Sequence, residues 1–350
     1  MVSVRKRSEK IRQFILENVE NHPKDVVRVT SKKFNISRQA VNKHIQTLSK
    51  QRAIKVEGTT KSRRYSLFPT KIEEKIYFLD SNLEEDVVWR NDILPLMGEF
   101  PDNVVDIWSY CFTEIFNNAI DHSSGKTVMV VVTKTAVTTQ IYISDDGEGI
   151  FNKIQRELNL LDESHAVLEL SKGKLTTDPS RHTGEGIFFS SRMVDDYQIL
   201  SGKTYFSHHH SNDVDWILER QKFQAGTSVF MKMKNNTSRT LKKVFDQFTS
   251  EKTYGFNKTI IPVRLVQYGD ELLVSRSQAK RLLSRIDRFK TVILDFDGIK
   301  EIGQAFADEI FRVFSSKNKG IQLLHINANK DVEQMIVRAL LVGYLSDSEF

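Results

Sequence analysis

The sequence predicts a multidomain protein with α+β and α/β parts, and three observations support that class. The 350 residues are enough for two or three domains with separate cores. The first 70 residues show three helical patterns and then a short hairpin, whereas residues 240–350 alternate strand and helix. Between these segments, a long helical pattern is followed by several β-rich runs.

Composition excludes several classes of protein. Hydrophobic residues make up 39% of the chain, yet no apolar run approaches the roughly 20 residues that a membrane span needs. Residues 1–10 are basic but lack the apolar stretch of a secretory signal. The single cysteine, Cys111, excludes an internal disulfide and a cysteine-rich zinc site. We therefore expect a cytoplasmic protein with no membrane partner.

Charge is distributed unevenly along the chain. Residues 1–70 contain 17 Lys and Arg against 5 Asp and Glu, a net charge of +12. The whole chain carries +6, so the other 280 residues together carry −6. The excess positive charge therefore predicts a polyanion partner for the first 70 residues only.

Three helices and a hairpin are predicted in that basic segment. Apolar residues recur at helical spacing over 8–21, and a second short helix covers 30–34. Ser37 follows a turn and is a good N-cap for a third helix that ends near Lys50. Two short strands then flank the turn Gly58-Thr59-Thr60.

This pattern resembles the winged helix-turn-helix domains of bacterial regulators, which implies a DNA-binding domain over residues 1–70. Side chains of the third helix would reach base edges or phosphates in a major groove, and those of the wing would contact backbone phosphates. The alternative is a basic winged domain used for protein contact or dimerisation. The candidate DNA contacts are Arg38, Gln39, Asn42 and Lys43 in the helix, and Lys61, Arg63 and Arg64 in the wing.

The middle of the chain is expected to form a second domain over residues 80–236. Pro69 begins a predicted linker, and 80–101 is expected to be mostly helical. A long helix follows from Asp102 to His122, and another helix starts after Gly186. Strands are expected over 127–133, 138–144, 197–200, 216–222 and 227–233.

Two sequence patterns in this domain indicate a binding site. Glu114 and Asn118 are four apart in the long helix, so both lie on one face. A carboxylate there can activate a nucleophile, and an amide oxygen can hold Mg²⁺. The second pattern is a strand that runs directly into Asp145-Asp146-Gly147-Glu148-Gly149.

Two further segments complete the set. Gly184-Glu185-Gly186 opens a helix, whose N-terminus favours phosphate oxygens, and Lys174 lies in the loop before it. Thr227 follows Gly226 at the start of a strand.

In order and spacing, these four segments resemble the ATP-binding domain of the GHKL superfamily (gyrase, Hsp90, histidine kinase and MutL). The resemblance implies a Bergerat-type α/β sandwich that binds ATP and Mg²⁺. It makes Glu114 the catalytic residue, Asn118 the Mg²⁺ ligand and Asp145 the residue that reads adenine. The other nucleotide-binding positions would be Gly147, Gly149, Lys174, Gly184, Gly186 and Thr227.

The chain departs from sensor kinases of this superfamily. It has one Gly-x-Gly rather than a longer glycine run, and no phospho-acceptor histidine is visible upstream. Asp121 could support the metal through water, whereas His122 and His182 could contact phosphate or serve packing. The run His208-His209-His210 could bind metal, but a solvated hairpin loop is the favoured interpretation.

The last domain is expected over residues 255–350. The stretch Asp295-Phe296-Asp297-Gly298-Ile299 resembles the strand-to-helix turn of STAS-like domains, relatives of the anti-anti-sigma fold. Such proteins have a serine at the helix start that a partner kinase phosphorylates, but this chain has Gly303-Gln304-Ala305 there. The alternative is a small α/β module without such a partner.

Together the domains suggest a bacterial transcription regulator in which the nucleotide state of the ATP domain is coupled to DNA binding and to partner docking. The alternatives are a serine/threonine-type protein kinase that acts on a separate partner, a slow ATPase with a nucleotide-timed homodimer cycle, and a scaffold that binds nucleotide structurally.

Overall fold

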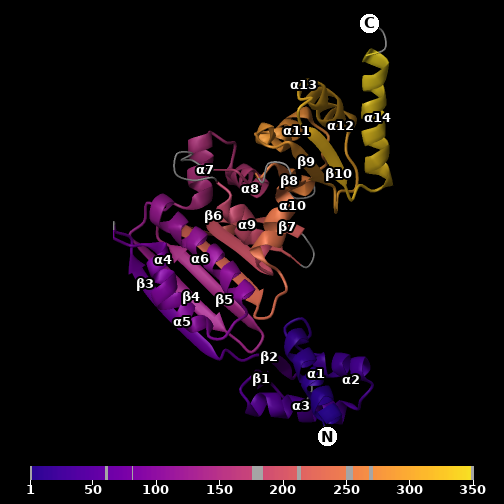
Figure 1. Ribbon diagram of the computed structural model, residues 1–350. Coiled ribbons are helices and arrows are strands. Elements are labelled where there is room, and N and C mark those ends of the chain that lie inside the picture. Colours follow the sequence, from indigo (N-terminus) through magenta and orange to yellow (C-terminus); the bar gives the residue numbers. More distant parts are fainter. Residues whose placement is uncertain are drawn as a thin grey trace.

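The computed structural model describes residues 2–59, 62–80, 82–175, 184–210, 214–249, 255–267 and 271–347. Three units follow one another along the chain (Figure 1). We call them the N-terminal unit (2–67), the central unit (71–248) and the C-terminal unit (255–347). Among the described residues, none of the helices is both long and apolar enough to cross a membrane.

The N-terminal unit consists of three helices and an antiparallel hairpin. The predicted turn between the second and third helices is present. Asn35 adopts a left-handed conformation with φ 50°, and Ser37 caps the third helix by accepting a hydrogen bond from the Ala40 amide at 3.2 Å. Val41, Ile45 and Leu48 of the third helix face the core. The elements are α1 (Val2–Asn18), α2 (Val26–Phe34), α3 (Arg38–Lys50), β1 (Ile54–Glu57) and β2 (Arg64–Leu67).

The central unit is built on a five-stranded antiparallel sheet in the order β3-β4-β5-β7-β6. Its first strand stands where the sequence predicted a linker, so that expectation is wrong. Charged residues interrupt the apolar pattern of this strand, because it is an edge strand that buries neither face fully. The strands are β3 (Lys71–Phe78), β4 (Thr127–Lys134), β5 (Thr138–Asp145), β6 (Asp196–His209) and β7 (Val214–Lys234).

Helices cover one face of this sheet, with α6 lying along it (Figure 1). Alternate residues of the inner strands, such as Val130 and Ile143, are buried under these helices. Phe112 and Phe116 of α6 stack at 5.1 Å between ring centroids. The helical elements are α4 (Glu85–Val88), η1 (Trp89–Ile93), α5 (Leu94–Met97), α6 (Asp102–His122), α7 (Ile150–Leu158), α8 (Glu163–Lys172), α9 (Gly186–Met193) and α10 (Leu241–Phe248).

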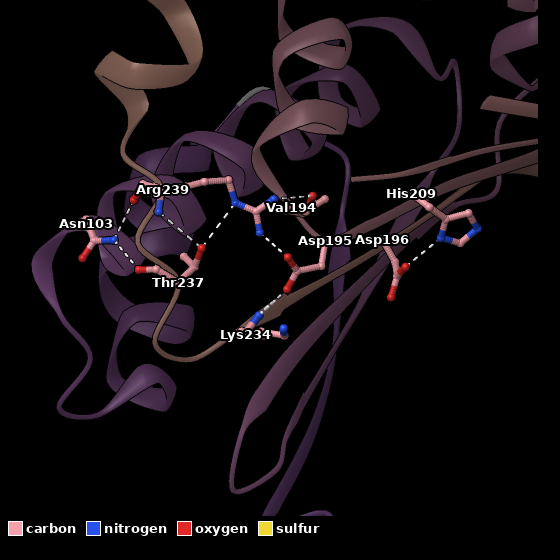
Figure 2. A network of polar contacts seen from close by, with 8 residues as sticks. All are labelled: Asn103, Val194, Asp195, Asp196, His209, Lys234, Thr237 and Arg239. Carbon is pink, nitrogen blue, oxygen red and sulfur yellow. Dashed lines mark hydrogen bonds and ion pairs between the residues drawn. The ribbon is translucent and has the colours of Figure 1, made fainter. Parts of the chain in front are cut away.

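The hairpin of β6 and β7 corrects the interpretation of the histidine run. Instead of lying in a solvated loop, His208 is buried and its Nδ1 lies 2.6 Å from Oδ1 of buried Asp215. The neighbouring His209 points to the other face, where its Nδ1 lies 2.7 Å from Oδ1 of Asp196 (Figure 2). Within the described part of the chain, no cluster of three potential metal ligands occurs.

The segment after β7 is fastened to the central unit by polar contacts (Figure 2). The Arg239 guanidinium donates to the Val194 carbonyl at 3.1 Å and forms an ion pair with Asp195. The Asn103 amide donates to the carbonyls of Thr237 and Arg239 at 2.8 and 2.7 Å. Helix α10, which follows, therefore packs as part of the central helix layer.

The C-terminal unit has a parallel three-stranded sheet in the order β10-β9-β8. Gly298, with φ 76°, turns the chain after β9, and Asp295 accepts hydrogen bonds from the Asp297 amide and the Asn327 side chain. The elements are β8 (Lys258–Pro262), η2 (Val263–Val266), α11 (Arg276–Leu283), η3 (Ile286–Arg288), β9 (Thr291–Asp295), α12 (Gln304–Ala307), η4 (Asp308–Phe314), α13 (Ser315–Lys317), β10 (Gln322–Ile326) and α14 (Lys330–Asp347).

Candidate functional site

A cavity of about 400 Å³ opens between the sheet and the helices of the central unit, within the size range of small-molecule sites. It is walled by α6, α7, the end of β5, the end of α8, the start of α9 and the part of β7 at Thr227 and Val229. Six of the nine predicted nucleotide-site residues line it: Glu114, Asn118, Asp145, Gly184, Gly186 and Thr227.

Helix α6 presents Glu114 and Asn118 to this cavity because its opposite face is committed to the core. Cys111, Phe112 and Ile115 are buried, which fixes the rotation of the helix about its axis. Burial also raises the pKa of the Cys111 thiol to about 12, so this residue is an inert core group. Glu114 and Asn118 are half-buried, with part of each side chain in the cavity.

Asp145 occupies the carboxyl end of β5. Its Oδ1 accepts hydrogen bonds from the Gly147 amide at 2.9 Å and the Thr227 amide at 3.1 Å. Both bonds end on Oδ1, so Oδ2 is available to accept a hydrogen from a ligand. Burial raises the pKa of the Asp145 carboxyl, although the two amide hydrogen bonds act against that shift.

Glycines around Asp145 allow the turn to pack closely against neighbouring segments of the chain. A Cβ on Gly226, which has φ 70°, would lie 2.0 Å from the Asp145 carbonyl oxygen. A Cβ on Gly147 would lie 2.0 Å from the Ser123 carbonyl oxygen, and one on Gly149 would lie 2.5 Å from Ser201 Oγ. Gly147 and Gly149 do not line the cavity, so the turn shapes the site without forming its wall.

The start of α9 lies against Glu114. A Cβ on Gly186 would be only 2.0 Å from Glu114 Oε2, so this carboxylate packs on the helix N-terminus. A Cβ on Gly184, which has φ 72°, would lie 2.4 Å from the backbone of Leu175. These glycines therefore bring the helix end, with its partial positive charge, to the cavity beside the carboxylate.

Lys174 lies elsewhere, although the sequence placed it in the nucleotide site. Its ammonium donates to the Arg288 carbonyl at 3.1 Å and lies over the rings of Phe256 and Phe289, all in the C-terminal unit. The Arg288 guanidinium returns a bond to the Lys174 carbonyl at 2.6 Å. This lysine thus joins two units in the structure and does not line the cavity. His182 is outside the described residues.

Folding brings in groups that the motifs did not indicate. Lys153 of α7 lines the cavity, and its ammonium donates to the His122 carbonyl at 2.9 Å. His122 also lines the cavity, whereas exposed Asp121 does not. The strong amphipathic pattern of 150–158 could have indicated a helix, but not that Lys153 would face the same space as Asn118.

Beside the cavity, α8 carries a buried ion pair. The Lys172 ammonium lies 2.7 Å from Glu169 Oε1 and donates to the Ser284 carbonyl at 2.8 Å, at the end of α11. Both side chains are almost fully buried. Burial opposes the charge on Glu169, but the nearby His165 imidazole and the Lys172 ammonium outweigh it and lower the pKa of this carboxyl.

The predicted DNA-contacting residues form a surface on the N-terminal unit. Arg38, Gln39 and Lys43 of α3 are exposed and Asn42 is half-exposed, on the side opposite the core residues of that helix. Arg63 and Arg64 of the hairpin are also exposed, and Lys61 lies outside the described residues. The geometry therefore leaves the described part of this basic set accessible to a polyanion.

Comparison with known proteins identifies one part of the chain. Residues 278–333 match the family model of a STAS-like domain of unknown function (DUF4325). This match spans α11 to the start of α14 and supports the prediction made from the Asp295–Ile299 turn. A search of curated proteins finds no match to the chain.

Proposed function

We propose that this chain is an ATP-binding regulator in which the nucleotide state of the central unit alters DNA binding and partner docking. One observation carries the proposal: four segments distant in sequence converge on one cavity with a half-buried carboxylate, an amide and a helix N-terminus. Asp145 would accept the adenine amino hydrogen through Oδ2, and the α9 end would face the phosphates.

The residues present suit ATP with Mg²⁺. Mg²⁺ in nucleotide sites takes one or two protein oxygens and completes its shell with phosphate and water. Asn118 offers an amide oxygen, and Glu114 lies one helical turn away where it can orient a water or an acceptor hydroxyl. A charged phosphate chain would compete with the Glu114 carboxylate for the end of α9, so binding would move this side chain.

Titration of the full-length chain with a fluorescent ATP analogue and Mg²⁺ tests the proposal. We expect Asp145→Asn to weaken binding about tenfold or more, because an amide cannot replace the charged acceptor. Asp106→Asn is the matched control, since Asp106 is an exposed carboxylate on α6 outside the cavity. Equal affinity of both variants, or no binding by the native chain, would refute a nucleotide site here.

The use of ATP is a separate question that labelled nucleotide resolves. Glu114→Ala should retain binding but lose turnover, because it removes the proposed base. Release of free phosphate by the native chain would support a slow ATPase, and transfer to an added partner would support a kinase. Retention of intact ATP would indicate a regulator that only binds. The C-terminal unit offers no hydroxyl at 303–305 to receive phosphate.

A direct structural path connects the cavity with the N-terminal unit. The β4–β5 turn carries Val137, which packs in the hydrophobic core of the N-terminal unit. Strand β5 starts at the next residue and ends at Asp145. Lys232 on adjacent β7 also forms an ion pair with Glu20 at 2.6 Å. We propose that nucleotide at Asp145 shifts β5 and thereby the placement of the basic DNA-contacting surface.

A second path leads to the STAS-like part. The segment 172–175, at the end of α8, holds Lys172 against the end of α11, and Lys174 against Arg288. Gly173 between them passes so close to Phe256 that a Cβ would lie 2.7 Å from its ring. The Leu175 amide of this segment donates to the Gly184 carbonyl at 3.1 Å, and both residues line the cavity. Nucleotide-induced movement of this segment would therefore change the surface that the C-terminal unit offers a protein partner.

A further inference from the structure

Strand β3 is an edge strand of the central sheet, and the backbone on its outer side is unpaired among the described residues. Strand β3 pairs along its whole length, Lys71–Phe78, with β4 on one side only. Across the ranges that the structure describes, no backbone segment pairs with its other side. Figure 1 shows β3 along the outer border of the sheet. An edge of eight residues with unpaired amides and carbonyls is a template for another strand.

Three apolar side chains of β3 are exposed together, although charged residues stand between them in the sequence. Ile72, Ile76 and Phe78 are 62%, 61% and 73% exposed, and they project from the same face because they are two or four residues apart. On the opposite face, Asp92 of η1 binds both Lys75 and Tyr77, which holds the strand in place. Natural edge strands usually avoid such apolar exposure, so a covering partner is expected.

The sequence of β3 is complementary to itself. Suppose that two copies of β3 pair antiparallel about a two-fold axis perpendicular to the sheet. Such an axis keeps each face of the sheet on its own side, so residues that lie opposite each other must be an even number of positions apart in the sequence. With the axis at Glu74, Ile72 lies opposite Ile76 and Glu73 lies opposite Lys75, each pair twice. An axis at Glu73 would instead oppose Lys71 to Lys75, and an axis at Lys75 would lose the charge pair. The pattern therefore selects Glu74.

We propose that two copies of this chain pair their β3 strands antiparallel about Glu74 and join their sheets into one. The apolar pairs supply burial and the Glu73–Lys75 pairs set the register. The two Glu74 carboxylates oppose each other at the axis and weaken the dimer. This proposal does not depend on nucleotide binding.

Disulfide trapping with the full-length chain tests the register. Directly opposed antiparallel residues have Cα atoms about 4.5–5.5 Å apart, within disulfide range. Glu74→Cys should therefore form a covalent dimer under mild oxidation, because position 74 meets its own copy. Buried Cys111 stays out of this reaction. Ile72→Cys and Ile76→Cys should each remain monomeric on a non-reducing gel, whereas an equal mixture of the two should cross-link.

Sedimentation equilibrium tests the association itself. The native chain should form a dimer, Glu74→Gln should tighten it severalfold by removing the repulsion, and Ile76→Lys should give monomers. Circular dichroism checks that Ile76→Lys remains folded, and the trapping result stands even if that variant fails to fold. A monomeric native chain, a dimer that Glu74→Cys does not trap, or trapping by position 72 or 76 alone would overturn the proposal.

Discussion

At the scale of single residues, Asp145 shows how a site carboxylate can conflict with stability. Burial raises its pKa, so the folded chain binds this proton more tightly than the unfolded chain does. The resulting stabilisation is present below the ordinary value of 3.8 and is lost as pH rises through the raised, folded-state pKa. At neutral pH the ionised group therefore costs stability, which a binding role would explain.

Asp145→Asn should reveal this cost, because asparagine keeps an acceptor oxygen for the Gly147 and Thr227 amides but carries no charge. We expect the unfolding free energy of the variant, relative to the native chain, to increase as pH rises from about 4 to 7. Urea unfolding at a series of pH values measures this difference. A constant difference across the series would show that Asp145 does not titrate with a raised pKa.

Single glycines decide whether the turn around Asp145 can form. Gly226→Ala should lower the free energy of unfolding by about 2–4 kcal/mol, because left-handed backbone and a 2.0 Å approach to the Asp145 carbonyl both oppose a side chain. Gly320→Ala is the control, since nothing lies within 4 Å of its Cβ, and should change stability by about 0.5 kcal/mol or less. Urea denaturation that found equal effects would contradict this account of the turn.

At the scale of elements, the contact of α8 with α11 depends on a charge held away from water. Lys172→Met should destabilise the chain by about 3–5 kcal/mol, because it leaves Glu169 buried without its ammonium partner. Lys242→Met removes an exposed pair of the same type with Asp246 and should cost less than about 1 kcal/mol. Urea unfolding compares the two.

A double variant sharpens that test. Lys172→Met combined with Glu169→Gln removes both charges and should recover part of the loss, since no uncompensated ion remains buried. If Lys172→Met lowered the free energy of unfolding no more than Lys242→Met does, the buried ion pair could not be the link that we propose between residues 172–175 and the STAS-like part.

The elements also show why some predictions from sequence succeed. Helix α6 has the predicted bounds, and α3 starts after Ser37 as predicted, because strong periodicity and a capping side chain are local properties. Strand β3 was missed because an edge strand, exposed on one face, carries charged residues that resemble a linker. His208 was placed in solvent because its partner Asp215 becomes its neighbour only when β6 and β7 pair.

At the scale of the whole molecule, the uneven distribution of charge predicts that the chain binds DNA. We expect the full-length chain to bind duplex DNA with an affinity that falls steeply with salt, because neutralised phosphates release counterions. Lys43→Ala should weaken binding to all sequences and reduce the slope of log affinity against log salt by about 1. Lys317→Ala, an exposed lysine on α13, is the control and should leave the slope unchanged.

If the nucleotide site and the DNA-binding surface are coupled, nucleotide should change the measured DNA affinity. Addition of ATP and Mg²⁺ should shift DNA affinity of the native chain but not that of Asp145→Asn. Binding without salt dependence would contradict a DNA role for the N-terminal unit, whereas salt-dependent binding indifferent to ATP would contradict the coupling alone.

The sequence by itself determined most of the helices and strands, the basic first segment, the STAS-like turn and six of the residues that line the cavity. These features depend on local periodicity, capping and motif order, which are properties of neighbouring residues. Only the tertiary structure decided that Lys153 enters the cavity, that Lys174 turns to the C-terminal unit and that β3 closes the sheet as an exposed edge. Such placements depend on which distant segments pack together, and no local pattern encodes that choice.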